Sequence, residues 1–298
     1  IYAGYGQLDT TAQDGITSAF YEWTQLSVSV TISRKEERQN SGRSRILNLL
    51  EAKTMQAEVS LQELLNNCIV SGRITSGASS LNGQFSARRG RLDSGADGPL
   101  PLTVLMDSNP SRSRTDLGNI NPSTFTFWRN QMFESVATTF AGLKQEMMDV
   151  YLRCSRGVGG APDLLICDEV AWREYWAALQ NNERYIITTQ KTVDILGGTE
   201  ALAFRTAALV WDEVVPDVTT NADVVDAIGT IATSTIFYIN SMALEAIVDS
   251  QTNMVSTPFV RPTDQDARTS QILWMGAMGT GNRRKLGVLK GISQTITS

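Results

Sequence analysis

The stretch MGAMGTGNRRKLG, residues 275–287, holds the residue types from which phosphate sites are built, because three glycines within six residues are followed by three consecutive cations. A phosphate loop of the Walker kind ends in Gly-Lys-Ser/Thr at the start of a helix, where backbone N–H groups, an ammonium and a magnesium-binding hydroxyl converge. Here Asn282 follows the last glycine, and Leu286 follows Lys285 where a hydroxyl residue is needed. The stretch is therefore not predicted to bind phosphate.

A β-hairpin is the better interpretation of the same residues. The glycines of GTGN, residues 279–282, permit positive φ at a turn, and the following LGVLKGI reads as a short strand. A hairpin leaves three cations on or next to an exposed rim, namely Arg283, Arg284 and Lys285. Charges at the rim of an interface steer the encounter of two proteins and fix their register. We therefore expect these cations to pair with an acidic surface on a neighbouring subunit. The anionic candidates in the N-terminal segment are Asp9, Asp14 and Glu22.

Cations gather in four further groups, which are Arg34/Lys35, Arg43/Arg45, Arg88/Arg89/Arg91 and Arg112/Arg114. A solvated surface is the default interpretation of each group, and a subunit contact is the sharper one. The further candidate contact residues are Arg34, Lys35, Arg88, Arg89 and Arg91. The whole chain carries 26 cations against 31 anions, a net charge of −5. Dedicated nucleic-acid binders gain affinity by neutralising many phosphates, so this balance argues against that class.

The carboxylate pairs Asp168/Glu169 and Asp212/Glu213 are the candidates for acid–base chemistry in a chain that contains no histidine. The absence of histidine excludes Ser-His-Asp and Cys-His nucleophiles and His-based metal sites. A carboxylate that begins a helix more often caps free backbone N–H groups, so Asp168 is predicted to be structural. Nothing in the sequence assembles a nucleophile, a base and an oxyanion site. We therefore predict that the protein is not an enzyme.

Two other groups of side chains also have structural interpretations. Trp172, Tyr175 and Trp176 share the spacing of a buried helix face, which favours a place in the core over a stacking platform. The three cysteines are widely spaced, with neither the paired spacing of a zinc site nor a dense disulfide framework. This usage fits a reducing compartment. We predict no cofactor and no metal site.

The elements that would position these residues follow from hydrophobic periodicity. Strict alternation over residues 26–33 predicts a half-buried strand, and helical spacing predicts a long helix over 44–69. A second amphipathic helix is predicted over 131–154. The apolar run at 162–168 predicts a buried strand that leads into a helix over 169–180. Further strands are predicted at 101–106, 207–215, 235–240, 271–275 and 286–292.

Helices and strands mix in the middle of the chain, whereas segments near its two ends are expected to return to one β-containing body. With 298 residues, of which 42% are hydrophobic, the chain can bury a large core. No apolar run approaches the roughly 18 residues that a spanning helix requires. We therefore predict no membrane association.

Four separate segments carry a resemblance that no short motif provides. The first, residues 23–72, joins a Trp-led strand to the long predicted helix. The others are GNINPSTFTFWRNQ (118–131), YLRCSRGVGGAPDLLICDEVAWREYWAALQNNERY (151–185) and PFVRPTDQDARTSQILWMGAMGTGNRRKLGVLKGI (258–292). In their order and spacing these segments resemble the tailed-phage major capsid proteins of the Hong Kong 97 type. The resemblance spans nearly the whole chain.

The resemblance implies an α+β fold, the Hong Kong 97-type capsid fold, with an L-shaped subunit. It implies an extension loop and its return strand at 1–33, followed by a peripheral domain at 34–126 that carries a spine helix at 44–69. An axial domain is implied at 127–234. Residues 235–298 are then expected to supply return strands to the peripheral domain and a C-terminal hairpin.

The function implied is that of a structural major capsid protein, which self-assembles into the icosahedral head shell around the double-stranded DNA genome of a tailed phage. Its implied partners are other copies in hexamers and pentamers, scaffold, portal and decoration proteins, and packaged DNA contacted without sequence specificity. The implied location is the capsid of the virion, assembled in the host cytoplasm. Two alternatives stay open, an encapsulin-type shell that holds cargo and an unrelated α/β enzyme or small-ligand-binding protein.

Overall fold

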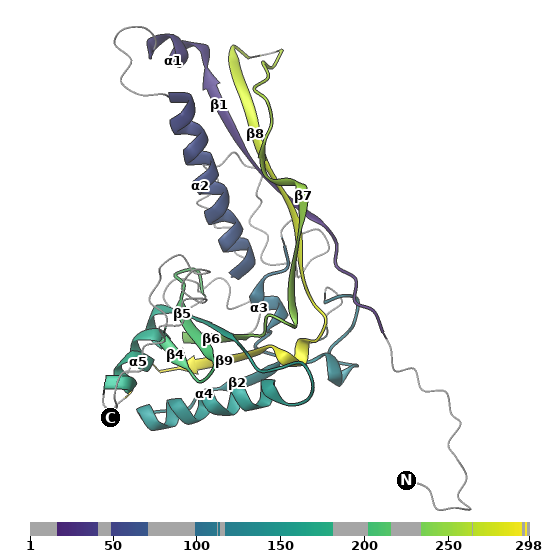
Figure 1. Ribbon diagram of the computed structural model, residues 1–298, viewed down its shortest axis with the longest axis vertical. Helices are drawn as coiled ribbons and strands as arrows, with labels where there is room; N and C mark the ends of the chain where they lie inside the picture. Colours follow the sequence, from purple (N-terminus) through teal and green to yellow (C-terminus); the bar gives the residue numbers. More distant parts are fainter. Residues whose placement is uncertain are drawn as a thin grey trace, which may run out of the picture.

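The computed structural model describes residues 17–40, 49–70, 99–111, 113, 117–180, 202–215, 234–263, 265–293 and 296. Figure 1 shows a long arm that rises from a broader body. The arm consists of helix α2 (Leu49–Val70) and the strands β1 (Thr24–Ser33), β7 (Leu244–Ser256) and β8 (Ala267–Thr280). The body is a second, six-stranded sheet with its own helices. The α+β class expected from the sequence is confirmed.

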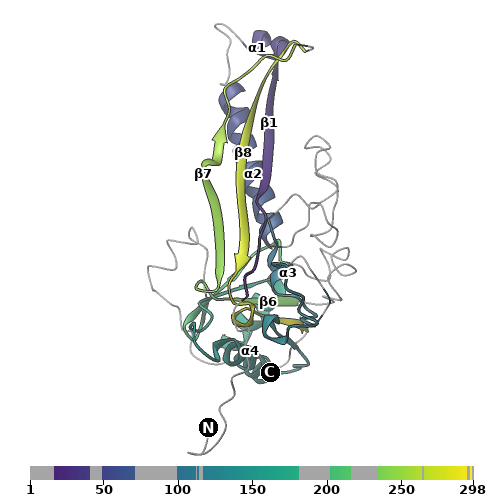
Figure 2. The same cartoon turned by 90° about the vertical axis from the view of Figure 1, so that its right-hand side faces the viewer.

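The three strands of the arm form an antiparallel sheet in the order β1-β8-β7. Figure 2 shows them side by side along the arm, with α2 behind. β1 pairs with β8 along its whole length, from Thr24 opposite Gly276 to Ser33 opposite Ala267. The alternating apolar face of β1 is buried, and it comprises Leu26, Val28, Val30 and Ile32. The predicted strand is confirmed, and so is the return of both chain ends to one β-structure.

Helix α2 covers the buried face of the arm sheet, because its own apolar residues recur on one side at helical spacing. The shared cluster comprises Ala57, Leu61, Leu64 and Cys68 of α2 with Leu26, Val28, Val30, Ile272 and Trp274 of the sheet. At 1.5 Å per residue the helix is about 33 Å long. It ends at Val70, close to the predicted end. Residues 44–48 of the predicted helix lie outside the described residues.

A short helix, α1 (Arg34–Gln39), closes the far end of the arm. Ser33 and Glu36 form a capping box, in which each side chain accepts a hydrogen bond from the backbone N–H of the other. Glu36 also pairs with Lys53 of α2 at 2.9 Å, and Glu37 pairs with Arg268 of β8 at 3.3 Å. These contacts tie the tip to both layers of the arm.

The sheet of the body has the order β2-β9-β6-β3-β5-β4. Its strands are β2 (Gln131–Glu134), β3 (Leu164–Cys167), β4 (Leu202–Phe204), β5 (Ala207–Trp211), β6 (Ser234–Ile239) and β9 (Gly287–Ile292). β2 is parallel to β9 and β3 is parallel to β5, whereas the other neighbours are antiparallel. Helices α4 (Phe140–Ser155) and α5 (Glu169–Gln180) cover one face, and their core includes Leu143, Met147, Val150, Leu165, Ile236 and Tyr238.

The opposite face of the body sheet packs on a second core, because successive side chains of a strand point to opposite faces. Phe237, Ile239 and Val288 lie on this face and belong to the same buried cluster as Leu102, Val104 and Leu105 of the short helix α3 (Leu102–Leu105). The same core includes Met278, near the end of β8. It therefore joins the body to the base of the arm.

The structure corrects two predictions about elements and adds elements that were not predicted, among them β7. The helix predicted over 131–154 is divided into β2 and α4, because Thr139 caps α4 by accepting the N–H of Gly142 at 3.2 Å. The strand predicted over 101–106 is the helix α3, in which the N–H groups of Val104 and Leu105 both donate to the carbonyl of Pro101. β7 was not predicted, because most of its residues on both faces are exposed and the sequence shows no alternation there.

The other predicted strands and the helix predicted over 169–180 agree with the structure. The strands expected at 162–168, 207–215, 235–240 and 286–292 are β3, β5, β6 and β9, and the strand at 271–275 is part of the longer β8. The helix at 169–180 is α5. The proposed division into extension loop, peripheral domain and axial domain stays a prediction.

Candidate subunit interface

Arg283 is fully buried, so it does not lie on the exposed rim that the sequence predicted. It begins a 3-10 helix, η3 (Arg283–Lys285), between β8 and β9. Its guanidinium donates to the carbonyl oxygens of Leu105 (2.6 Å), Val104 (3.1 Å) and Trp128 (3.3 Å). Two of these carbonyls end α3, and the last carbonyls of a helix have no partner within it. Arg283 thus holds the second core together.

Lys285 is buried as well, with 2% of its surface exposed. Its ammonium donates to three carbonyl oxygens in the loop after α4, those of Arg156 (3.1 Å), Gly157 (3.2 Å) and Gly160 (3.1 Å). An ammonium has three donors, so all of them are used. Positive φ at Gly157 and Gly160 lets this loop curl around the ammonium.

The strands that flank GTGN do not form a hairpin. β8 belongs to the arm sheet and β9 belongs to the body sheet, so residues 281–286 cross from one to the other. The rim prediction is therefore wrong for Arg283 and Lys285, because buried carbonyls of α3 and of the loop after α4 need donors at this crossing. Arg284, between them, is exposed.

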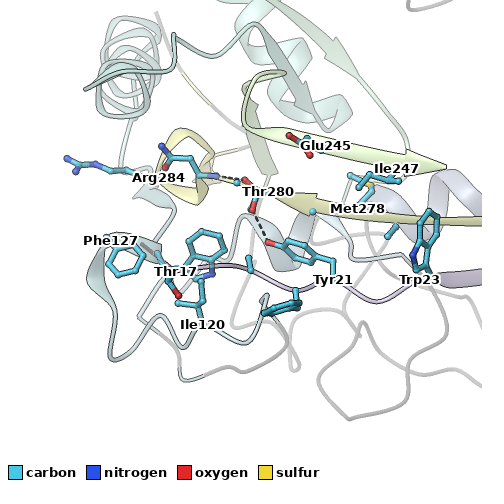
Figure 3. Close-up of a pocket in the computed structure, with 17 residues that line it drawn as sticks. Thr17, Tyr21, Trp23, Ile120, Phe127, Glu245, Ile247, Met278, Thr280 and Arg284 are labelled. Carbon is cyan, nitrogen blue, oxygen red and sulfur yellow. Dashed lines mark hydrogen bonds between the residues drawn. The ribbon is translucent and has the colours of Figure 1, made fainter. Parts of the chain in front are cut away.

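Arg284 lines a pocket of about 880 Å³ at the base of the arm, which we call the aromatic pocket (Figure 3). Its walls are residues 17–23, the adjoining ends of β7 and β8, and a segment around 120–128. The large apolar side chains in these walls are Phe20, Tyr21, Trp23, Ile120, Phe127, Trp128, Ile247 and Met278. Phe20, Trp23, Phe127 and Ile247 are each more than half exposed. An exposed apolar surface of this kind is typical of a binding site.

Tyr21 fixes one wall of the aromatic pocket. Its hydroxyl donates to the carbonyl of Thr280 at 3.0 Å, and burial raises the pKa of Tyr21. Its ring lies on Gly279, where an added Cβ would come within 2.6 Å of the ring. The neighbouring N–H of Phe20 donates to the carbonyl of Gly118 at 3.3 Å. Residues 17–23 are therefore anchored to both the arm and the body.

Of the other predicted contact residues, only Glu22, Arg34 and Lys35 lie within the described residues, and Glu22 is not near the other two. Arg34 and Lys35 are exposed on α1, at the end of the arm away from the body (Figure 1). Arg34 pairs with Asp266 of the same chain at 3.7 Å. Glu22 is exposed beside the aromatic pocket. The remaining candidates, Asp9, Asp14, Arg88, Arg89 and Arg91, lie outside the described residues.

Sequence reasoning missed several exposed apolar side chains. Met55 and Val59 are 63% and 58% exposed on α2, one helical turn apart. Val158, in the loop around Lys285, is 97% exposed, and Met242, which lies near Gly160 of the same loop, is 78% exposed. For α2 the sequence did contain a signal of an exposed apolar surface, because apolar residues also occur on the side of the helix opposite the arm sheet. Isolated apolar residues in loops give no such signal.

Two of the candidate carboxylates, Asp168 and Asp212, have structural partners. Asp168 is buried and accepts hydrogen bonds from the Ser234 hydroxyl (2.5 Å), the Thr235 N–H (3.1 Å) and the Val170 N–H (3.3 Å). Burial raises the pKa of Asp168, and these hydrogen bonds oppose that shift. Asp212 accepts from the N–H of Val214 at 2.8 Å. Asp168 therefore joins β6 to the start of α5, as a capping role predicts.

The aromatic stripe on α5 is divided between core and surface. Tyr175 is buried and donates to the carbonyl of Ala203 at 2.7 Å. Trp172 and Trp176 stack on each other, with ring centroids 6.5 Å apart, and Trp176 is 37% exposed. The core prediction is thus confirmed for Tyr175 but not for Trp176.

Within the described residues, no group of three or more His, Cys, Asp and Glu side chains could hold a metal ion. None of the helices in this part of the chain is both long and apolar enough to cross a membrane. Cys68, Cys154 and Cys167 are buried and not bonded to one another.

Comparison with solved structures shows which proteins share this fold. The capsid of cyanophage A-1(L) matches with a TM-score of 0.60 and 11% identity, over 97% of this chain and 83% of that chain. An encapsulin from the holo-SrpI complex of Synechococcus elongatus matches at 0.56 and 9%, over 93% and 76%. The capsid of Myoviridae phage XM1 matches at 0.55 and 10%, over 96% and 82%. No protein-family model and no curated protein sequence matches.

Most of these similar structures are tailed-phage capsids. The chain therefore has the Hong Kong 97-type capsid fold that the four sequence segments implied. At identities near 10%, the likeness lies in the arrangement of arm and body rather than in shared residues.

Proposed function

We propose that this chain is the structural subunit of a self-assembling capsid shell, of the kind that encloses the double-stranded DNA of a tailed phage. The observation that carries the proposal is the likeness of 97% of the chain to a cyanophage capsid structure. The subunits would assemble as hexamers and pentamers. The location proposed is the capsid of the virion.

The distribution of exposed apolar side chains supports this proposal. They occur on α2, on β7, in the loop around Lys285 and in the aromatic pocket, and thus on the arm, on the body and at their junction. A subunit that contacts several neighbours through different surfaces forms heterologous contacts, which generate closed assemblies when the rotation closes. Each contact can bury a modest area, because a shell repeats the same contact many times.

We also propose a structural rather than catalytic role, and only weak, salt-dependent contact with packaged DNA. The net charge of −5 supports the second point, because tight binding to a polyanion requires many cations.

Electron microscopy of the purified chain tests the proposal. Large icosahedral particles or extended tubes made of hexamers would support a phage-type capsid. Small shells filled with a host enzyme would instead indicate an encapsulin, and a small soluble oligomer would indicate neither. A chain that stayed monomeric at high concentration, with and without a scaffold protein, would contradict the proposal.

A further inference from the structure

The loop around Lys285 and the turn before β7 form one rigid projection of the body. Asn240 is buried and links the two, because its amide donates to the carbonyl of Gly159 at 2.9 Å and accepts the N–H of Met242 at 2.9 Å. Together with Lys285, it binds four of the five carbonyls of residues 156–160. A buried polar network with its partners satisfied makes a loop rigid.

This projection, residues 156–160 and 240–242, ends in two apolar side chains, and we call it the knob. Val158 is the most exposed large apolar side chain among the described residues, and Met242 is also strongly exposed. The Met242 sulfur lies 3.7 Å from where a Cβ at Gly160 would be, so the two parts adjoin. Neither side chain belongs to a described core. Apolar side chains fixed in advance favour binding, because little conformational entropy is then lost on contact.

The aromatic pocket has the complementary shape, since it is concave and has apolar walls. The knob does not line the pocket of its own chain. A convex and a concave apolar surface on different parts of one subunit are the two halves of a heterologous contact. Other strongly exposed apolar side chains are less suited to enter a pocket. Met55 and Val59 lie on the side of a helix, and Val136 stands alone between β2 and α4.

The two surfaces carry charges of both signs at their margins. In the pocket, Glu245 comes from β7 and Arg284 from η3, and the two lie apart in Figure 3. On the knob, Arg156 belongs to the first loop, and Asp163 is tied to the second by hydrogen bonds from the N–H and the hydroxyl of Ser241. All four charged side chains are exposed, and none forms an ion pair within the described residues.

We propose that the knob of one copy enters the aromatic pocket of a neighbouring copy, with Val158 toward β7, and that its own pocket receives the knob of a third copy. Arg156 then meets Glu245 of the neighbour, and Asp163 meets Arg284. The occupant is a second copy, because this chain carries both halves of the contact and their charges are complementary. The inference rests on the proposed shell function, in which each copy contacts several neighbours.

Disulfide cross-linking of the full chain tests this contact, because the native cysteines are buried. The double variant Val158→Cys/Ile247→Cys places one thiol on the knob and one on the pocket wall. Each chain can then bond to a different neighbour through each thiol, so a mild oxidant should produce a ladder of covalent oligomers on a non-reducing gel.

The matched control is Val136→Cys/Ile247→Cys, since Val136 is also a strongly exposed valine of the body but lies outside the knob. The ladder should form about tenfold faster in the Val158 variant than in this control, because docking raises the local concentration of the two thiols. Equal rates for the two variants would overturn the proposal.

The gel and electron microscopy decide the contact and the shell separately. Particles made of chains that stay monomeric on the gel would overturn the knob contact and leave the shell function standing. A ladder without particles would support the contact and count against the shell, and the absence of both would contradict both. A faster-migrating monomer band would show a bond within one chain, and dimers alone would show a two-fold contact. Either result would overturn the head-to-tail arrangement.

Charge reversal tests the orientation of the knob. In the Val158→Cys/Ile247→Cys chain, Arg156→Glu brings two anions together and should slow the ladder severalfold. Glu245→Arg should do the same by bringing two cations together. The combination of both reversals restores opposite charges and should return the rate to near that of the cysteine variant alone. A combined variant as slow as either single reversal would overturn the pairing of Arg156 with Glu245.

Discussion

At the residue scale, Arg283 links its own segment to two segments that are distant in sequence. Its guanidinium donates hydrogen bonds to backbone carbonyls of α3 and to that of Trp128. Arg283→Met removes these donors and leaves buried carbonyl oxygens unpaired. We expect the free energy of unfolding to fall by about 3–5 kcal/mol, because each buried carbonyl left without a donor costs about 1–3 kcal/mol. The exposed neighbour Arg284 gives a matched control, because Arg284→Met should change the free energy of unfolding by less than about 0.5 kcal/mol. Urea denaturation measures both, and equal effects would contradict the burial of Arg283.

The buried thiols predict a dependence of stability on pH. Burial raises the pKa of Cys68 and of Cys154 from 9.0 to about 12. A group whose folded pKa lies above its unfolded pKa adds stability that is complete below the unfolded value and is lost as the pH rises through the folded value. We therefore expect the free energy of unfolding to fall between pH 9 and pH 12.

Two measurements check this prediction. In urea titrations over that pH range, Cys68→Ala should show a shallower loss of stability than the parent chain, since it lacks one of the shifted thiols. At about pH 8, a thiol reagent should label none of the three cysteines until urea unfolds the chain. Rapid labelling of the native chain would show that the thiols are accessible.

At the element scale, the end of β8 depends on one glycine and not on its neighbour in the GTGN stretch. A Cβ at position 279 would lie 2.6 Å from the Tyr21 ring, whereas a Cβ at position 281 would meet nothing within 4 Å. Gly279→Ala should therefore destabilise the protein by about 1–3 kcal/mol through overpacking, and Gly281→Ala should have little effect. Thermal unfolding of the two variants provides the comparison. Similar melting temperatures would show that Tyr21 does not rest on Gly279.

Elements with a single buried face could be predicted from the sequence, because burial on one side creates a period. The alternation of β1 and the helical spacing of α2 are examples, and both are confirmed. β7 lacks that period because most of its residues are exposed. The helix at 131–154 was predicted too long because Phe133 and Val136 continue the spacing of α4 beyond its Thr139 cap.

The buried cations could not be predicted for a different reason. Arg283 and Lys285 donate to backbone carbonyls, which every residue carries, so no residue type in the sequence marks their partners. Arg284 was placed correctly, but nothing in the three-cation run separates it from its neighbours. The aromatic pocket was equally hidden, since its walls come from three parts of the chain that only the fold brings together.

At the scale of the whole molecule, the outward side of α2 can be tested as an assembly surface. Met55→Gln and Val59→Gln together remove exposed apolar surface without adding charge, so the free energy of unfolding should change by less than about 0.5 kcal/mol per site. If α2 contacts a neighbour in the proposed shell, the yield of particles seen by electron microscopy should fall severalfold. Glu58→Gln, an exposed change on the same helix, should leave the yield unchanged. Normal particle yield from the double variant would remove α2 from the interface.

The pairing of β1 with β8 also sets the order in which the molecule can form during synthesis. The Thr24 hydroxyl donates to the carbonyl of Gly276, and these residues are 252 positions apart. β1 and α2 leave the ribosome long before β8, the strand that completes the sheet of the arm. A nascent chain that stops before β8 keeps an unpaired β1 edge and cannot build the arm. The arm therefore distinguishes finished chains from unfinished ones, and a truncated product lacks the rigid part needed to join its neighbours.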